Sequence, residues 1–447
     1  MKILPEAFVV RMKNLLKDEY TDFEKALNQK SVRAFRVNTH KISVPDFEKL
    51  GAFRTEKIPF VENGFYFDYD KIGLHPLHHA GAIYVQEPSA MAPTECVDIK
   101  DDWNVVDMCA SPGGKSTQIK NKIPHGVLVS NEIVPSRCKT LTGNIERLGL
   151  HNTVTTCMDT TRLADTFGAV FDLCVCDAPC SGEGMFRKDD NAVNEWSAEN
   201  VEMCAARQAE ILDNAARLVR GGGYIIYSTC TFSPEENEKT VDLFLLRHKN
   251  FALVPVTERV QNNTSDGISF DGCNSQSIHF CRRFYPHKQK GEGQFMAVLK
   301  NTDLPTSNNE SIKIKKPDKL VFEFLNETLT NYEPSYVQLH GDTPIYFTDK
   351  FDIKNSRAFS VGVNIGEIRK NYIIPHHQFF MAMGKDFKRR IDLSADSDLL
   401  QKYLHGEEIQ TDCQNGWAVV TVNGCAVGGA KVVNGTAKNH YPKGLRN

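Results

Sequence analysis

Two cysteines of this chain follow apolar runs and have neighbours that can take part in covalent chemistry. Cys230 lies between two threonines in YSTCTFSPEEN (227–237), directly after an apolar run. Cys180 ends an Asp-Ala-Pro-Cys motif that begins at Asp177 and follows a second apolar run. Free cysteine is among the most buried residue types, so either thiol could simply fill a core. At the carboxyl end of a strand in an open α/β sheet, however, a thiol lies where such sheets bind ligands.

One reaction that uses these groups together is methyl transfer to carbon 5 of cytosine. Carbon 5 is too weakly nucleophilic to take a methyl group until a thiolate adds to carbon 6, which is a form of covalent catalysis. A carboxyl group can assist at N3, and a further group must help the thiolate to leave after the transfer. Cys230, Asp177 and Cys180 supply these groups at the ends of two strands that we expect to be neighbours.

Methyltransferases that act on the amino group of adenine or cytosine have a similar strand end, in which Asn or Asp precedes two prolines and an aromatic residue. Here Ala178 replaces one proline and Cys180 replaces the aromatic residue. These replacements disfavour an amino-directed enzyme but leave other methyl-transfer reactions open.

A glycine-rich turn follows the first strand of the same region, in the stretch DMCASPGGKS (107–116). A phosphate-binding loop of the Walker type needs glycine five residues before its Gly-Lys pair, but Cys109 stands there. A dinucleotide fingerprint needs GxGxxG, and only the pair Gly113-Gly114 is present. The remaining interpretation is S-adenosylmethionine, with Glu132 after the next strand accepting from the ribose hydroxyls and Asp159 after the third accepting from the adenine amino group.

The elements that must position these residues alternate between apolar runs and amphipathic segments. The candidate strands are 103–109, 126–131, 153–158, 171–177, 224–229, 251–255 and 295–299, and the candidate helices are 115–122, 135–148, 198–218 and 235–248. Helices between short buried strands predict an α/β fold with a doubly wound, mostly parallel, seven-stranded Rossmann-like sheet. The last two strands are expected to form an antiparallel pair at one edge, and strands four and five should lie side by side.

The rest of the chain divides by composition. We expect an amino-terminal α/β segment over residues 1–80, a methyltransferase domain over 81–300, a polar linker over 301–318, an intermediate α/β domain over 319–390 and a small β-rich module over 391–447.

The bulk composition limits the class of protein. The chain has 447 residues with 13 cysteines, an odd number spread over its whole length, which predicts free thiols in a reducing, cytoplasmic setting. No cysteine pair has zinc-site spacing, no run is apolar enough to span a membrane and the start does not read as a signal peptide, so we expect no metal and no membrane. A monomer is expected.

Charge is unevenly distributed along the chain. The net charge is −3, yet residues 413–447 contain no acidic side chain. The basic residues Lys431, Lys438, Lys443 and Arg446 all lie in that stretch. Such a segment is typical of a surface that binds a polyanion, although a solvated tail gives the same pattern.

Taken together, these motifs resemble those of the RNA 5-methylcytosine methyltransferases of the NOP/SUN class, with the bacterial RsmF type most similar. The matching stretches are HPLHHAGAIYVQEP (75–88), DMCASPGGKS (107–116), DAPCSGEG (177–184), STCTFSPEE (228–236), RRFYPHKQKGEGQFMAV (282–298) and KNHYPKGLR (438–446). The resemblance implies S-adenosylmethionine as cofactor, ribosomal RNA or the small ribosomal subunit as partner, an RNA-contacting amino-terminal segment and a PUA-like carboxyl-terminal module.

The resemblance also assigns roles. It implies Cys230 as the nucleophile, Cys180 as the residue that assists release, and Asp177 as the assisting carboxyl group. The cofactor site it implies consists of Cys109, Ala110, Ser111, Pro112, Gly113, Gly114, Lys115, Glu132, Arg137, Asp159 and Asp177. RNA contacts are expected at Arg36, Lys431, Lys438, Lys443 and Arg446. The alternative is a ribosome-assembly factor whose methyltransferase domain only binds RNA.

Overall fold

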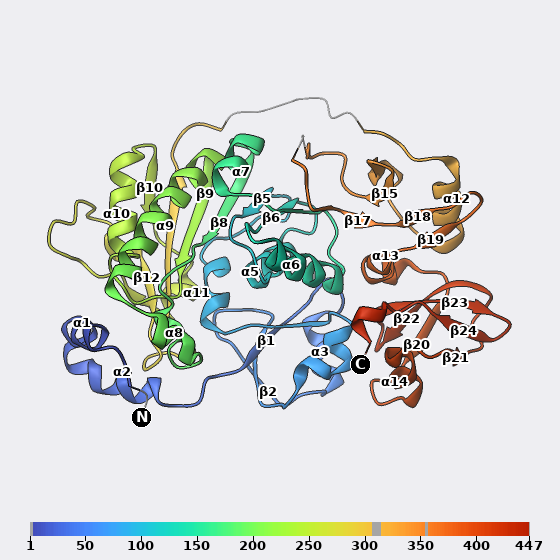
Figure 1. Cartoon of the computed structure of the whole chain (residues 1–447), viewed down its shortest axis with the longest axis horizontal. Helices are drawn as coiled ribbons and strands as arrows, with labels where there is room; N and C mark the ends of the chain where they lie inside the picture. Colours follow the sequence, from blue (N-terminus) through green and yellow to red (C-terminus); the bar gives the residue numbers. More distant parts are fainter. Residues whose placement is uncertain (1–2, 306–313, 354–355, 447) are drawn as a thin grey trace.

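The computed structural model describes residues 3–305, 314–353 and 356–446, and within these ranges ten strands form one central sheet (Figure 1). Its middle consists of parallel strands in the order β9-β8-β5-β6-β7. These strands are β5 (Val105–Asp107), β6 (Leu128–Asn131), β7 (Thr153–Thr156), β8 (Phe171–Asp177) and β9 (Val219–Thr229). The chain order reverses on either side of β5, as the predicted doubly wound fold requires.

The edges of the sheet are antiparallel. β13 (Gln294–Asn301) pairs with β9, and β10 (Phe251–Val254) pairs with β13, which confirms the antiparallel pair expected at one edge. Three further strands extend the sheet beyond the seven predicted: β11 (Ser265–Asp266), β12 (Arg282–Phe284) and β16 (Ser360–Val361). Each has only two or three residues, too few for an alternation that a sequence could reveal.

Helices cover both faces of the central sheet. They are α5 (Gly114–Lys122), α6 (Pro135–Leu148), α7 (Thr160–Phe167), α9 (Ala198–Leu218), α10 (Glu238–Arg247) and α11 (Glu258–Gln261). The short helix α8 (Asp190–Glu195) packs instead against the apolar cluster around Phe8. Along β8 the side chains alternate, with Leu173 and Val175 in the core beside α5 and Cys174 and Cys176 in the core beneath α9. Because both faces are buried, the strands read as continuous apolar runs in the sequence.

The amino-terminal part contains the helices α1 (Glu6–Leu16) and α2 (Tyr20–Leu27) and a small antiparallel sheet of order β2-β3-β1-β4. Its strands are β1 (Ala34–Val37), β2 (Thr55–Lys57), β3 (Gly64–Phe67) and β4 (Ile83–Val85), with the helices α3 (Val44–Leu50) and α4 (Pro76–His79) between them. The amino-terminal part extends beyond the boundary expected at residue 80, because β4 pairs with β1 and so belongs to this sheet.

The carboxyl-terminal third forms three smaller sheets. The first two contain β14 (Val337–His340), β15 (Thr343–Tyr346), β17 (Val363–Asn364), β18 (Gly366–Ile368) and β19 (Ile373–Pro375), near the helices α12 (Lys319–Thr328) and α13 (His377–Met383). The third has the order β20-β22-β23-β24-β21, with β20 (Arg390–Leu393), β21 (Ile409–Gln410), β22 (Gly416–Val422), β23 (Cys425–Val433), β24 (Thr436–Asn439) and helix α14 (Asp398–His405). This last sheet corresponds to the β-rich module expected over 391–447.

The amino-terminal part, the central sheet and the carboxyl-terminal third pack directly against one another. The intermediate region contributes β16 to the central sheet and places Ile345 and Phe347 in its core. The amino-terminal sheet and the carboxyl-terminal module share one apolar core, which includes Phe35, Phe65 and Val420. Residues 306–313, the middle of the linker expected over 301–318, lie outside the described residues. Within the described ranges, no helix has the length and apolar character needed to cross a membrane.

Candidate active site

The structure brings the two motif cysteines into contact. Cys180 follows β8 and Cys230 follows β9, and these strands are parallel neighbours with Asp177 level with Ser228. The two sulfur atoms are 3.2 Å apart. The hydrogen bond to Cys230, together with burial, raises the pKa of the Cys180 thiol well above its usual value. Cys180 is therefore protonated at neutral pH and can donate its hydrogen to the sulfur of Cys230.

Asp177 is held in place at the end of β8 by two partners. Lys115 Nζ lies 2.7 Å from Oδ2 of Asp177, and the hydroxyl of Ser228 donates to Oδ1 at 2.7 Å. The Lys115 side chain is only 9% exposed, so this ion pair is weakly screened by solvent. The carboxylate is therefore fixed beside the cysteines instead of rotating freely.

Two cavities meet at these residues. One has a volume of about 570 Å³ and is lined by Lys115 and by residues of β13 and the amino-terminal sheet. The other has a volume of about 650 Å³ and is lined by Glu132, Asp159 and Cys180. The lining residues shared by both cavities are Cys109, Ser111, Arg137, Asp177 and Cys230. A group bound in one cavity can therefore reach a group bound in the other at Cys230 and Asp177.

The glycine-rich turn forms the wall between the two cavities. Gly113 has a φ of 111°, which favours glycine, and a Cβ on Gly114 would lie 3.2 Å from the amide of Gln86. Cys109, Ala110, Ser111, Pro112, Gly114 and Lys115 all line the smaller cavity. Gly113 does not line it and instead supports the turn. Arg137 braces the turn from α6, because its Nη2 donates to the carbonyl oxygen of Ser111 at 3.1 Å.

The two acids predicted for the cofactor both line the larger cavity, but in different settings. Glu132 is only 3% exposed, accepts from the amide of Val134 at 3.0 Å and lies 3.4 Å from Nη2 of Arg137. Asp159 is exposed and caps α7, where its Oδ1 accepts from the amide of Arg162 at 2.8 Å. The cap uses Oδ1, one of the two carboxylate oxygens of Asp159.

A clamp that sequence reasoning missed holds the Cys180 loop. Glu236 Oε2 accepts from the amide of Ser181 and from Nε2 of Gln208, each at 2.9 Å. The helix expected from residue 235 begins only at Glu238, because Glu236 and Asn237 are used in this clamp. Asn237 accepts from the hydroxyl of Thr229 at 2.6 Å and donates to the carbonyl oxygen of Thr231 at 3.0 Å. The only signal in the sequence is the Pro-Glu-Glu-Asn stretch at 234–237, which begins four residues after Cys230.

The amino-terminal helix supports the same loops from outside. Glu183, which is fully buried, pairs with Arg11 of α1 and accepts from the indole nitrogen of Trp196 at 2.8 Å. Its second oxygen accepts from the amide of Phe232, two residues after Cys230, at 3.1 Å. Helix α1 therefore helps to fix the loop that carries Cys230, a contact that no local pattern could predict.

Known proteins match this chain over its whole length. The chain is 30% identical to the ribosomal RNA small subunit methyltransferase F of Klebsiella pneumoniae, with 99% of this chain and 96% of that protein aligned. The chain belongs to the ribosomal RNA small subunit methyltransferase F family. The Vibrio cholerae member of the family is 29% identical, with 99% of this chain and 97% of that protein aligned.

Family models match three consecutive parts of the chain. "N-terminal domain of 16S rRNA methyltransferase RsmF" matches residues 4–88, "16S rRNA methyltransferase RsmB/F" matches residues 95–300 and "Methyltransferase RsmF PUA domain" matches residues 390–447. The resemblance noted from the motifs is thereby confirmed, and the carboxyl-terminal module is a PUA domain.

Solved structures confirm the fold. A methyltransferase homologue from Pyrococcus horikoshii is 27% identical with a TM-score of 0.59, and the match covers 66% of this chain and 95% of that one. The NSun6 protein of the same organism is 23% identical with a TM-score of 0.56, and the match covers 67% of this chain and 98% of that one. Both support a Rossmann-like methyltransferase fold for this member of the F family.

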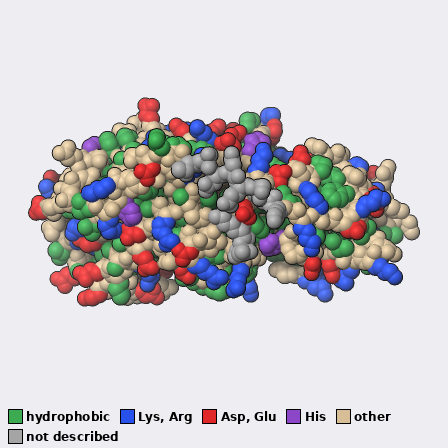
Figure 2. All heavy atoms as spheres, turned by 90° about the horizontal axis from the view of Figure 1, so that it is seen from above, with side chains coloured by type: hydrophobic (Ala, Val, Ile, Leu, Met, Phe, Trp, Pro, Cys, Tyr) green, Lys and Arg blue, Asp and Glu red, His purple; other side chains and the backbone are tan. Residues whose placement is uncertain are grey.

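The residues predicted to contact RNA differ in their exposure to solvent. Lys431 and Lys438 are exposed and lie opposite each other on β23 and β24, with Lys431 Nζ 5.5 Å from the ring of Trp417. Lys443 is also exposed. In Figure 2 Lys and Arg side chains lie across the right-hand part of the visible face, which the carboxyl-terminal third forms.

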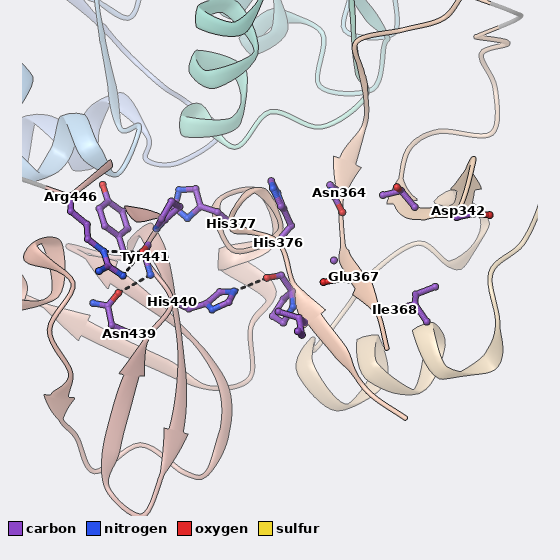
Figure 3. Close-up of a pocket in the computed structure, with 15 residues that line it drawn as sticks. Asp342, Asn364, Glu367, Ile368, His376, His377, Asn439, His440, Tyr441 and Arg446 are labelled. Carbon is purple, nitrogen blue, oxygen red and sulfur yellow. Dashed lines mark hydrogen bonds between the residues drawn. The ribbon is translucent and has the colours of Figure 1, made fainter. Parts of the chain in front are cut away.

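Arg446 lies at a cavity of about 760 Å³ between the PUA domain and the strands β17 to β19 (Figure 3). His376, His377 and His440 also line it. Arg446 is half-buried, and its Nη2 donates to the carbonyl oxygen of Tyr441 at 3.1 Å. It therefore fixes the carboxyl-terminal segment, and an RNA contact there stays a prediction.

The expectation for Arg36 is corrected by its burial. Its side chain is 1% exposed and its guanidinium donates to Gln86 Oε1 at 2.7 Å, to the carbonyl oxygen of Gly114 at 2.7 Å and to Thr117 Oγ1 at 2.9 Å. A guanidinium used in this way is not available to phosphates. Arg36 instead holds the amino-terminal sheet against the start of α5.

We predict that the exposed lysine pair contributes electrostatic contacts to RNA. Replacing Lys431 and Lys438 together by serine should weaken RNA binding and reduce the slope of log affinity against log salt by about 1.5, because two phosphate contacts are lost. The control is a Lys100→Ser/Lys249→Ser variant, which removes two exposed lysines from other parts of the surface. Filter binding at several salt concentrations measures both slopes, and equal slopes in the two variants would remove the pair from the RNA interface.

Proposed function

We propose that this protein transfers the methyl group of S-adenosylmethionine to carbon 5 of a cytosine in small-subunit ribosomal RNA. The observation that carries the proposal is the contact between Cys180 and Cys230 beside Asp177, where two cavities meet. The names of its relatives support the RNA class, since they are methyltransferases of small-subunit ribosomal RNA. The Pyrococcus NSun6 structure contains SFG, an analogue of S-adenosylmethionine, which supports the cofactor.

The larger cavity fits S-adenosylmethionine by the chemistry of its donors and acceptors. Glu132 offers a buried carboxylate for the ribose hydroxyls, and Asp159 offers Oδ2 to the adenine. Cys109 and Ser111 of the glycine-rich turn also line this cavity and would hold the amino acid part. When bound, S-adenosylmethionine supplies an electrophilic methyl group at the junction of the two cavities.

The residues of the chain perform the remaining steps. The Cys230 sulfur, as a thiolate, forms a bond to carbon 6, and the electron pair of the C5–C6 double bond becomes available at carbon 5. Asp177 assists by passing a proton to N3, which is returned when the bond to Cys230 breaks. After methylation the carbon 5 proton is removed, the double bond re-forms and the bond between carbon 6 and Cys230 breaks. Contact with Cys230 is the first cause of the raised pKa of Cys180. Conversion of Cys230 into a thioether removes that cause, so Cys180 can lose its own proton to solvent and then, as a thiolate, accept the carbon 5 proton.

Bisulfite sequencing tests the proposed function directly. Small-subunit ribosomal RNA from cells that lack the protein should lose protection at one or a few cytosines, and re-expression should restore it. Recovery of normal protection by the Cys230→Ala variant would favour the alternative of an RNA-binding assembly factor, since that role does not use the thiol.

The cofactor assignment gives a separate prediction. Glu132→Ala and Asp159→Ala should each weaken S-adenosylmethionine binding by about one to two decades, because each removes a charge-assisted hydrogen bond. Titration calorimetry measures the affinity. Asp165→Ala is a matched control, since Asp165 is an exposed carboxylate on α7 that pairs with Arg217 and lines neither cavity. Unchanged affinity in both test variants would exclude the larger cavity as the cofactor site.

A further inference from the structure

Besides Oδ1 of Asp107, two buried polar atoms of residues that line the smaller cavity have no partner among the described residues. They are Oε1 of Glu292 and Nε2 of Gln294. Both residues line the cavity beside Lys115, Asp177 and Cys230, and they are only 2% and 3% exposed. Buried polar atoms nearly always have a hydrogen-bond partner, so two unpaired atoms in one cavity call for an explanation.

Both side chains are held in place by the segment that leads into β13. Arg187 donates from Nε to Oε2 of Glu292 and from Nη2 to the carbonyl oxygen of Gly291, each at 2.8 Å. The amide of Glu292 donates to Oε1 of Glu87 at 2.8 Å. A Cβ on Gly293 would lie 2.3 Å from the ring of Phe232, so the backbone of this segment packs closely against Phe232. Oε1 of Glu292 therefore stays free while Oε2 is occupied.

The two residues also lie close together in the chain. Glu292 is two residues before Gln294, the first residue of β13, and both line the smaller cavity. Together they present one negatively charged acceptor and one amide donor to the cavity. This pattern complements the Watson–Crick edge of cytosine, which has a donating N4 amine and an accepting O2, with N3 between them. Uracil has an accepting O4 where cytosine has the amine.

We propose that Glu292 accepts from the N4 amine of the target cytosine and Gln294 donates to its O2, so that this pair selects cytosine against uracil. The proposal rests on the proposed function, because it concerns the base bound beside Cys230. Asp177 remains the partner of N3. Enzymes that act on an extruded base read it through hydrogen bonds to this edge, and a carboxylate placed against O4 of uracil would be repelled.

Covalent trapping separates recognition of the base from the later steps. Once bisulfite sequencing has located the cytosine, a short RNA that contains it is made with 5-fluorocytidine or 5-fluorouridine at that position. Fluorine at carbon 5 leaves no proton to remove, so the adduct with Cys230 accumulates after methyl transfer. Its rate of formation is followed on denaturing gels for each RNA. The ratio of the two rates measures the selection of cytosine.

The Glu292→Gln variant should form the 5-fluorocytidine adduct about 10- to 100-fold more slowly, because one charge-assisted hydrogen bond is lost. The ratio of the two rates should also fall, because the new amide can donate to O4 of uracil. Gln294→Met should slow both adducts by a similar factor and leave the ratio unchanged, because both bases carry O2. This variant leaves the Arg187–Glu292 pair intact, so it tests the cavity even if Glu292→Gln folds poorly.

Glu95→Gln is the matched control, since Glu95 is a buried carboxylate paired with Lys122 and lines neither cavity. It should lower the unfolding temperature but keep the ratio of the wild type. A folded Glu292→Gln variant with the wild-type ratio, or a Gln294→Met variant with wild-type rates, would overturn the proposal. Absence of any adduct with wild-type protein and 5-fluorocytidine RNA would instead refute the proposed function itself.

Discussion

The Cys180→Ala variant is expected to accumulate a covalent complex with RNA, whereas Cys230→Ala should form none. Cys230→Ala removes the atom that bonds to carbon 6, so methylation should fall by about 10⁴-fold or more, as for other enzymes that lose their nucleophile. Cys180→Ala keeps that atom but loses the group placed 3.2 Å from it. Attack and methyl transfer then proceed while release fails, and a slowly migrating protein–RNA band should appear on a denaturing gel.

Cys176 provides the control for these two variants. It lies on β8 only four residues before Cys180, but it is fully buried in the core beneath α9 and lines neither cavity. Cys176→Ala should therefore methylate RNA normally and trap nothing. If Cys230→Ala traps RNA and Cys180→Ala is merely inactive, the two thiols have the reverse roles. If neither substitution affects methylation, both are core residues and the covalent mechanism is wrong.

The part of the fold that the sequence predicts is the central sheet, because apolar strands alternate there with amphipathic helices. The strands β5 to β9 are buried on both faces, so they appear as apolar runs separated by helical periodicity, and the predicted parallel order follows from that alternation. Helix α9 matches its predicted bounds, Ala198–Leu218, because Ser197 caps it through the amide of Asn200. The residues predicted at strand ends lie together in the structure because the topology places the ends of neighbouring parallel strands at one edge of the sheet.

Residues that act through contacts distant in sequence could not be found in this way. Glu292 and Gln294 line the smaller cavity, yet Cys230 lies more than 60 residues before them along the chain. Glu183 forms an ion pair with Arg11, which lies 172 residues before it in the chain. For Arg36 the prediction was wrong in the other direction. This basic residue was expected to contact RNA, but its side chain is buried and donates a hydrogen bond to the carbonyl oxygen of Gly114. Charge in a sequence does not reveal whether its side chain is exposed.

The division into domains shows the same limit. The amino-terminal sheet and the PUA domain look like separate units because some 300 residues lie between them in the sequence. In the structure the two units share one apolar core. Lys41, in the amino-terminal part, also donates to the carbonyl oxygen of Met381 in α13. Neither unit buries its apolar side chains alone. Truncation of the carboxyl-terminal module would therefore expose this core. For that reason, replacing surface lysines tests the RNA surface better than deleting the module.

A large loss of stability is expected for Arg283→Met. Arg283 is 1% exposed and Glu238 is fully buried, and the guanidinium donates from Nε to Oε1 of Glu238 at 2.6 Å. Its Nη1 also donates to the carbonyl oxygen of Phe232 at 2.9 Å. Removing one partner of a buried ion pair leaves the other charge uncompensated, so the free energy of unfolding should fall by about 3–5 kcal/mol.

Urea unfolding of three variants separates the charge effect from the loss of packing. The double variant Arg283→Met/Glu238→Gln leaves no buried charge and should recover a substantial part of the loss. Arg217→Met removes an exposed pair with Asp165, whose side chains are 47% and 61% exposed, and should cost less than about 1 kcal/mol. Because Phe232 follows Cys230 by two residues, Arg283→Met should also slow adduct formation at temperatures where the protein is still folded. A stability equal to that of Arg217→Met would mean that the Arg283–Glu238 pair does not hold this loop.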